Sequence, residues 1–174
     1  ITTNAQIDTA QVVRDTIKDI GYCASEMGFD HASCSVIIAL DKQSPDIAQG
    51  VNEGDGLHEQ QGAGDQGLMF GYACNETDSL MPLAIDLSHR LVARHAEARR
   101  AETIPDLRPD AKSQVTVLYE DGKPTRIDTV VLSAQHEEDV TDVARSDSGI
   151  EAMITPVLAA AMISNHTRVL VNPT

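Results

Sequence analysis

Residues 61–73 have the sequence QGAGDQGLMFGYA, a glycine-rich turn that leads directly into an apolar run. Four glycines fall within ten residues, and three of them match the Gly-x-Gly-x-x-Gly pattern of dinucleotide-binding loops. That pattern normally follows a strand and opens a helix, whereas here a polar loop precedes it and Leu68–Ala73 predicts a strand. Two interpretations stay open: a glycine turn entering a buried strand, or a turn whose unusual backbone angles hold Asp65 and Gln66 over a pocket.

The composition is typical of a globular protein with an aliphatic core. The 174 residues are 41% hydrophobic but only 3% aromatic, and the formal net charge is −14. This charge argues against nucleic acid and anionic membranes as partners, because both require a basic face. It allows a small polyanion as a ligand, since a few local cations can reverse the field of a pocket.

Two further features bear on the cellular setting. The longest strictly apolar run, Val157–Ile163, is far shorter than a membrane span. The odd set of cysteines, Cys23, Cys34 and Cys74, lacks paired spacing. Reduced core thiols in a cytoplasmic protein are therefore expected.

The first third of the chain predicts one helix, one strand and a long loop. Asp8 is a good N-cap and Gly21 supplies a stop, so we predict a helix over residues 8–20. The β-branched run Ser35–Leu40 predicts a buried strand. Residues 41–61 contain glycines and acids without a periodic pattern, which is typical of a lid or binding loop.

The remainder predicts a complete α+β unit. After the strand at 68–73, a helix begins near Pro82, and a tight turn at Asp121-Gly122 joins two strands. An acidic run at 137–142 predicts a solvated loop. The other expected elements are strands at 115–119, 127–132 and 168–171, a helix at 150–163, and a helix face formed by Ala84, Leu87, Leu91 and His95.

The resulting order is β-α-β-β-α-β, the split βαβ topology. It predicts a mixed, antiparallel-rich sheet with helices on one face. The chain would then comprise a central α+β domain over 62–174 and, over 1–61, the remainder of a second similar unit.

Several blocks, in the same order, resemble S-adenosylmethionine synthetase (methionine adenosyltransferase). The resemblance runs from Ile1 to Thr174 and is weakest over 137–166. It implies an internal piece of a longer enzyme, because the family's His-Pro-Asp-Lys and Ser-Gly-Lys-Asp-Pro stretches are absent. The blocks are GAGDQG at 62–67 with GYA at 71–73, KQSPDI at 42–47, NETD at 75–78, LRPDAKSQV at 107–115 and VVLSAQH at 130–136.

The resemblance implies a reaction in which the sulfur of L-methionine attacks the ribose C5′ of ATP and triphosphate leaves and is hydrolysed. Lys112 is the candidate catalytic cation on the leaving group. Asp110, Ala111 and Lys112 form the candidate ATP motif, in which Asp110 accepts hydrogen bonds from ribose hydroxyls. Gln43 and Asp65 are the candidate methionine contacts.

The resemblance also implies Mg²⁺ and K⁺, whose ligands are expected in the absent segments, so no metal ligand is assigned in this sequence. It implies a homodimer or dimer of dimers, paired over flat apolar sheets, and places 41–61 at a flexible loop that closes over the active site. A thioether is already nucleophilic, so alignment and neutralisation of the leaving group are the main requirements.

Other interpretations remain for each candidate. Lys112 could pair with an acid, Asp110 could cap a turn, Asp65 could satisfy glycine-loop amides and Gln43 could be solvated. For the whole chain, the alternatives are a non-catalytic homologue that pairs with a catalytic subunit, or a small α+β binding module.

Overall fold

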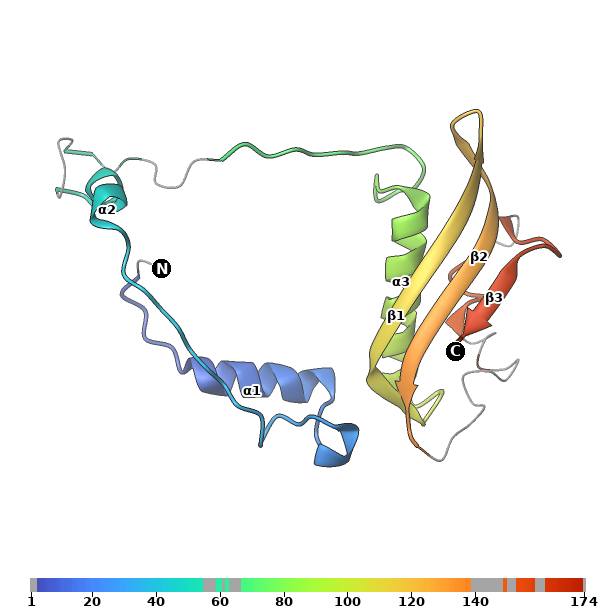
Figure 1. Ribbon diagram of the computed structural model, residues 1–174, viewed down its shortest axis with the longest axis horizontal. Helices are drawn as coiled ribbons and strands as arrows, with labels where there is room; N and C mark the ends of the chain where they lie inside the picture. Colours follow the sequence, from blue (N-terminus) through green and yellow to red (C-terminus); the bar gives the residue numbers. More distant parts are fainter. Residues whose placement is uncertain are drawn as a thin grey trace. The chain divides into compact units, whose positions relative to one another are not determined.

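The computed structural model describes residues 3–54, 59–60, 62, 67–138, 149, 153–158 and 162–173. It divides into two compact units, Ile1–Gly71 and Tyr72–Thr174, each with its own local structure (Figure 1). The domain boundary predicted between residues 61 and 62 stays a prediction.

The first unit begins with a capped amphipathic helix, α1 (Thr9–Ile20). The Asp8 carboxylate accepts a hydrogen bond from the third backbone amide beyond it at 3.0 Å, and Gly21 ends the helix with φ of 115°. Arg14 donates hydrogen bonds of 2.6, 2.8 and 2.9 Å to carbonyls within 31–34, which fastens the following loop to the helix. The predicted helix over 8–20 is confirmed.

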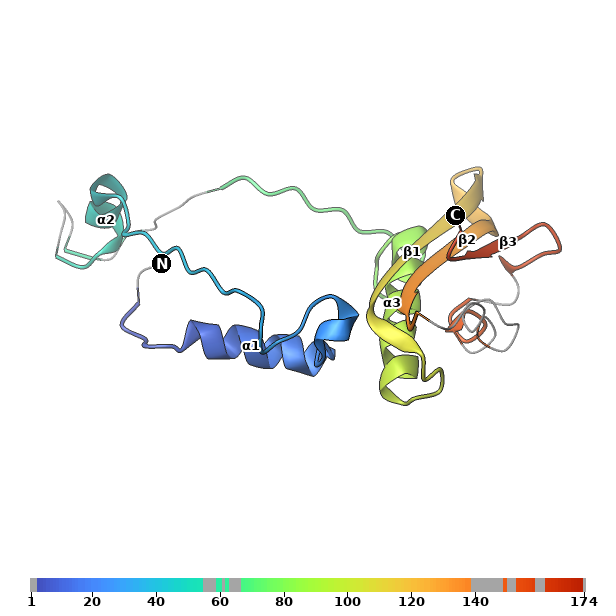
Figure 2. The same cartoon turned by 60° about the horizontal axis from the view of Figure 1, so that its bottom comes forward.

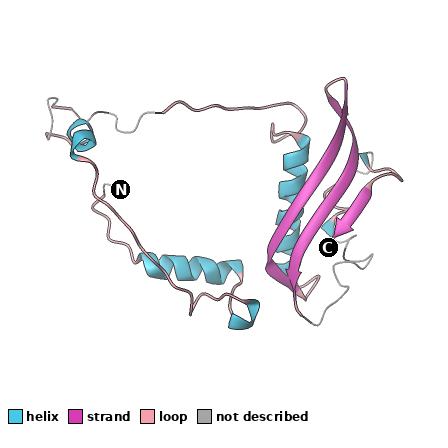
Figure 3. Ribbon diagram, in the orientation of Figure 1, coloured by secondary structure: helices cyan, strands magenta, loops and turns pink. Residues whose placement is uncertain are grey.

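The strand predicted over Ser35–Leu40 is wrong. These residues are extended but form no ladder with any described segment, and Figure 3 shows helices and loops in this unit. Ile37 is 89% exposed, so an expected core side chain faces solvent within the unit. The apolar run favours extended backbone, but a strand also needs a hydrogen-bonded neighbour.

The predicted loop over 41–61 contains a short helix, α2 (Pro45–Val51), with Pro45 in its first turn. A 3₁₀ turn, η1 (Ser25–Met27), precedes it in the chain. Gly62 lies against the carbonyl oxygen of Gly50, where an added Cβ would have no room. At this position, therefore, glycine allows a close backbone approach.

The strand predicted over Leu68–Ala73 is also wrong. The segment is extended without ladder pairing, and Phe70 is 92% exposed. Asp65 and Gln66, the residues proposed to face a pocket, lie outside the described residues.

The second unit packs α3 (Leu83–Arg100) against a three-stranded sheet. The strands are β1 (Leu107–Glu120), β2 (Lys123–His136) and β3 (Arg168–Val171). Figure 2 shows β2 between β1 and β3; β1 and β2 are antiparallel, and β2 and β3 are parallel. This mixed sheet with helices confirms the α+β class.

The hairpin turn has the predicted chemistry. Asp121 and Gly122 have φ of 51° and 75°, as a two-residue type I′ turn requires. Both strands extend well beyond the predicted 115–119 and 127–132, because pairing continues from Glu120↔Lys123 back to Leu107↔His136.

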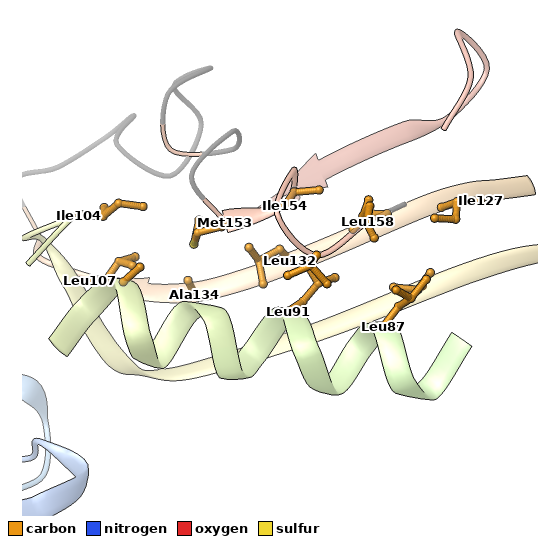
Figure 4. Packing of buried hydrophobic residues seen from close by; sticks show 14 of the residues in the cluster. Leu87, Leu91, Ile104, Leu107, Ile127, Leu132, Ala134, Met153, Ile154 and Leu158 are labelled. Carbon is orange, nitrogen blue, oxygen red and sulfur yellow. The ribbon is translucent and has the colours of Figure 1, made fainter. Parts of the chain in front are cut away.

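One aliphatic cluster holds the second unit together, as Figure 4 shows. The expected face of α3 is confirmed for Leu87, Leu91 and His95, which are buried, whereas Ala84 is only half-buried and Leu83 is buried beside it. Only part of the helix predicted over 150–163 is described, and its residues 154–157 form turns that pack beside α3. The cluster comprises Leu83, Leu87, Leu91, Ala98, Ile104, Leu107, Val115, Ile127, Val130, Leu132, Ala134, Met153, Ile154, Val157 and Leu158.

Within the described ranges, each helix is too short or too polar to traverse a lipid bilayer. All three cysteines fall inside those ranges and are free thiols. Cys23 is exposed and the other two are half-buried, so the expectation of core thiols is wrong.

A side-chain clasp ties the start of α3 to the hairpin. The Glu76 carboxylate accepts hydrogen bonds from the backbone N of Leu83 at 2.8 Å and from the Tyr119 hydroxyl at 2.7 Å. Pro82 cannot cap the helix with its side chain, so Glu76 supplies the missing acceptor. The same hydrogen bonds lower the pKa of Glu76 and raise the pKa of Tyr119 to about 12.

We therefore expect Glu76→Gln to lower the stability of the second unit in a pH-dependent way. Because the folded pKa of Glu76 is below the ordinary 4.5, its contribution is fully present above that pH and is lost as pH falls through the folded pKa. Urea midpoints of the two proteins should differ at pH 7 and converge in acid. Asp78→Asn, an equal charge change at an exposed neighbour, is the control; a difference from the parent that is independent of pH would contradict the clasp.

Candidate active site

The candidate ATP motif, Asp110, Ala111 and Lys112, lies in the first half of β1. The strand begins irregularly: Leu107 pairs with His136, and the next pair is Ala111 with Ala134. Three residues of β1, 108–110, therefore oppose one residue of β2. Such bulges re-aim side chains and occur often beside active sites.

Beyond the bulge, β1 presents Lys112 on the sheet face away from α3. The Ser113 hydroxyl donates a 2.7 Å hydrogen bond to the Ser88 carbonyl of α3, so Ser113 faces the helix. Alternate strand residues point to opposite faces, and Lys112, Gln114 and Thr116 are all exposed. The motif lysine thus stands on the open face of the sheet.

Lys112 and Asp110 are available for a ligand. Within the described ranges neither side chain makes an ion pair or a hydrogen bond, and both residues are exposed. The ion-pair interpretation of Lys112 and the turn-capping interpretation of Asp110 therefore find no support there. Two surface hollows among the described residues are lined in part by α3, and neither is lined by a residue of this motif.

A buried histidine lies within electrostatic reach of the motif. His95 is 1% exposed, and its Nε2 has no hydrogen-bond partner among the described residues. Burial, followed by the charge of Arg99, lowers the pKa of His95, while Asp110 opposes the shift. His95 is therefore neutral at neutral pH and adds no positive charge near the motif.

Of the two methionine candidates, only Gln43 lies among the described residues. Gln43 lies in the first unit, half-buried in the extended segment before α2. Asp65 lies outside the described residues. The second unit alone thus carries the ATP part of the predicted site.

An ion pair that was not predicted from the sequence lies beside the motif. Arg108 is 9% exposed and holds Glu137 with two hydrogen bonds, Nε to Oε1 at 3.2 Å and Nη2 to Oε2 at 2.6 Å. Glu137 lies in the acidic loop predicted to be solvated, and it is exposed, but its carboxylate also pairs with Arg108. Residues 139–142 of that loop lie outside the described ranges. The signal was available, since register counted from Asp121-Gly122 brings Arg108 near Glu137.

Across the parts of the chain that are described, no three His, Cys, Asp or Glu side chains converge into a metal site. The described residues therefore do not supply a set that fits the Mg²⁺ or K⁺ expected from the resemblance, and no chemical step is assigned to either ion.

Comparison with known proteins shows which protein family the chain belongs to. Residues 60–174 match the family model "S-adenosylmethionine synthetase, central domain", and residues 1–45 match the corresponding N-terminal domain. The chain belongs to the S-adenosylmethionine synthetase family.

A relative makes the comparison more specific. The chain is 55% identical over 174 residues to a protein of Desulfosudis oleivorans named S-adenosylmethionine synthase. The match covers 100% of this chain and 45% of that relative, so the chain spans less than half of the relative's length.

Proposed function

We propose that this chain forms part of a methionine adenosyltransferase and supplies the strand that binds ATP. The main support is the exposed, unpaired Asp110–Lys112 motif on β1 of a domain that matches the family's central domain. The name of the Desulfosudis oleivorans relative supports the same activity.

The reaction needs no general base. The methionine sulfur donates its lone pair to the ribose C5′, the C5′–O5′ bond breaks, and triphosphate leaves with the bonding electrons. Water then hydrolyses triphosphate to phosphate and diphosphate. Catalysis depends on aligning sulfur with carbon and on placing cations where leaving-group charge develops.

Each candidate residue has a role in this scheme. Lys112 neutralises charge on the triphosphate, Asp110 accepts hydrogen bonds from the ribose hydroxyls, and Ala111 spaces them on the strand. Gln43 and Asp65 contact methionine, with 41–61 acting as a closing loop. Mg²⁺ and K⁺ would be held by ligands outside this chain and would supply further positive charge, and the enzyme is a homodimer or dimer of dimers in the cytoplasm.

The free lysine favours this proposal over a non-catalytic homologue, because a structural partner has no need for an unpaired cation beside an exposed acid. One lysine–phosphate contact contributes roughly 1.5–3 kcal/mol. A micromolar complex requires about 8 kcal/mol. The remaining binding energy must therefore come from outside the motif.

We expect the full-length protein to convert ATP and methionine to S-adenosylmethionine, phosphate and diphosphate, and the 174-residue chain alone to form none. Mass spectrometry of the products, with methionine omitted as control, measures this. Robust product formation by the 174-residue chain would contradict the prediction that this chain alone is inactive. No product from the full-length protein would contradict the proposed function.

A further inference from the structure

The backbone conformation of the bulge at 108–110 depends on contacts other than ladder hydrogen bonds. Regular ladder pairing stops at Leu107 and resumes at Ala111, so the backbone that carries Asp110 lacks the usual cross-strand constraint. Lys112 follows directly after the point where pairing resumes. The geometry of both motif side chains thus depends on how the bulge is fixed.

Glu137 holds the bulge from the opposite strand end by two kinds of contact. Its backbone N donates a 3.0 Å hydrogen bond to the Asp106 carbonyl, immediately before β1. Its carboxylate takes both hydrogen bonds from Arg108, the first residue of the bulge. The pKa of Glu137 is lowered, chiefly by the hydrogen bond from Arg108, so the contact favours the ionised carboxylate.

The geometry of this ion pair is better suited to orienting the bulge than to stabilising the folded protein. The Glu137 side chain is 49% exposed, and ion pairs open to water add little to stability. Two parallel hydrogen bonds from a planar guanidinium, however, fix direction as well as distance. Arg108 is buried at the bulge, so its fixed orientation is transmitted to the backbone next to Asp110.

We propose that the Arg108–Glu137 pair is a positioning clamp that holds the β1 bulge so that Asp110 and Lys112 are presented correctly to ATP. The inference rests on the proposed function. Neither clamp residue touches the substrate; both act through the backbone of 108–110.

The test compares Glu137→Gln with Glu138→Gln in the full-length protein. Both substitutions remove one negative charge, at adjacent exposed positions, but only the first breaks the clamp. We expect Glu137→Gln to lower kcat/KM for ATP by about tenfold or more, since small misplacement of binding groups is costly. The KM for methionine should change less than about twofold, and Glu138→Gln should match the parent.

A second variant separates charge from geometry. Arg108→Lys keeps the positive charge but cannot form the two-pronged contact, so it should resemble Glu137→Gln. In both clamp variants, amide hydrogen exchange at Ala111 and Lys112 should accelerate. The melting temperature of the protein should change by only a few degrees, because the Glu137 side of the pair is open to water.

The outcomes separate the clamp from the proposed function. If the parent is active and Glu137→Gln behaves like Glu138→Gln, the clamp is wrong and the function stands. Equal losses toward ATP and methionine, with a matching fall in melting temperature, would show a purely structural pair and overturn the clamp. An inactive parent would overturn the proposed function, and the clamp with it.

Discussion

Lys112→Ala is expected to lower kcat of the full-length protein by about 10²- to 10³-fold, the effect typical of removing one preorganised group from a developing negative charge. Leaving-group charge is greatest in the transition state, so the loss should fall on the chemical step. The KM for methionine should change less than about threefold. Steady-state kinetics with each substrate varied in turn provides both values.

Lys123→Ala is the matched control for this substitution. Lys123 is an exposed lysine on the same hairpin, at the turn end of β2, far along the strands from the motif. It should behave like the parent. If methionine affinity collapsed in Lys112→Ala while kcat stayed intact, the role assigned to Lys112 would be wrong.

Leu91→Ala is expected to destabilise the second unit by about 2–5 kcal/mol. Leu91 is fully buried at the centre of α3, where it packs against the sheet that carries Lys112 on its opposite face (Figure 4). The loss combines the transfer energy of the removed methyl groups with the cavity left between helix and sheet. Equilibrium urea unfolding followed by circular dichroism measures it.

Ile85→Ala tests whether this loss comes from burial. Ile85 lies on the same helix but is 39% exposed, so its truncation should cost less than about 1 kcal/mol. A similar urea midpoint for the two variants would contradict the placement of Leu91 at the centre of the core.

Local chemistry was enough to predict several elements. Asp8 and Gly21 mark the two ends of α1, because a capping carboxylate and a left-handed glycine act within a few residues of the chain. Asp121-Gly122 predicted the hairpin for the same reason, since the turn conformation is set by two residues.

Two predicted strands failed because pairing is not a local property. Ser35–Leu40 and Leu68–Ala73 have the apolar content of strands, yet neither finds a neighbour among the described residues. The short helix α2 was missed for the opposite reason: Pro45 begins it, but glycines and acids obscure its periodicity.

The candidate site was predicted only as far as sequence motifs extend. The residues Asp110, Ala111 and Lys112 could be singled out from the resemblance, but their place on a strand was not predicted, because the expected strand began at residue 115. The bulge was not predicted either, because bulges depend on the partner strand. Arg108 and Glu137, 29 residues apart, required strand register to be recognised as partners. Gln43 and Asp65 remain predictions.

The most direct test of the ATP-binding strand is a crystal structure of the full-length protein with a non-hydrolysable ATP analogue and methionine. We predict that Lys112 Nζ will lie about 2.7–3.2 Å from a phosphate oxygen. The Asp110 carboxylate should lie within hydrogen-bond distance of the ribose hydroxyls. An analogue bound elsewhere, with Lys112 still directed into solvent, would contradict both predictions.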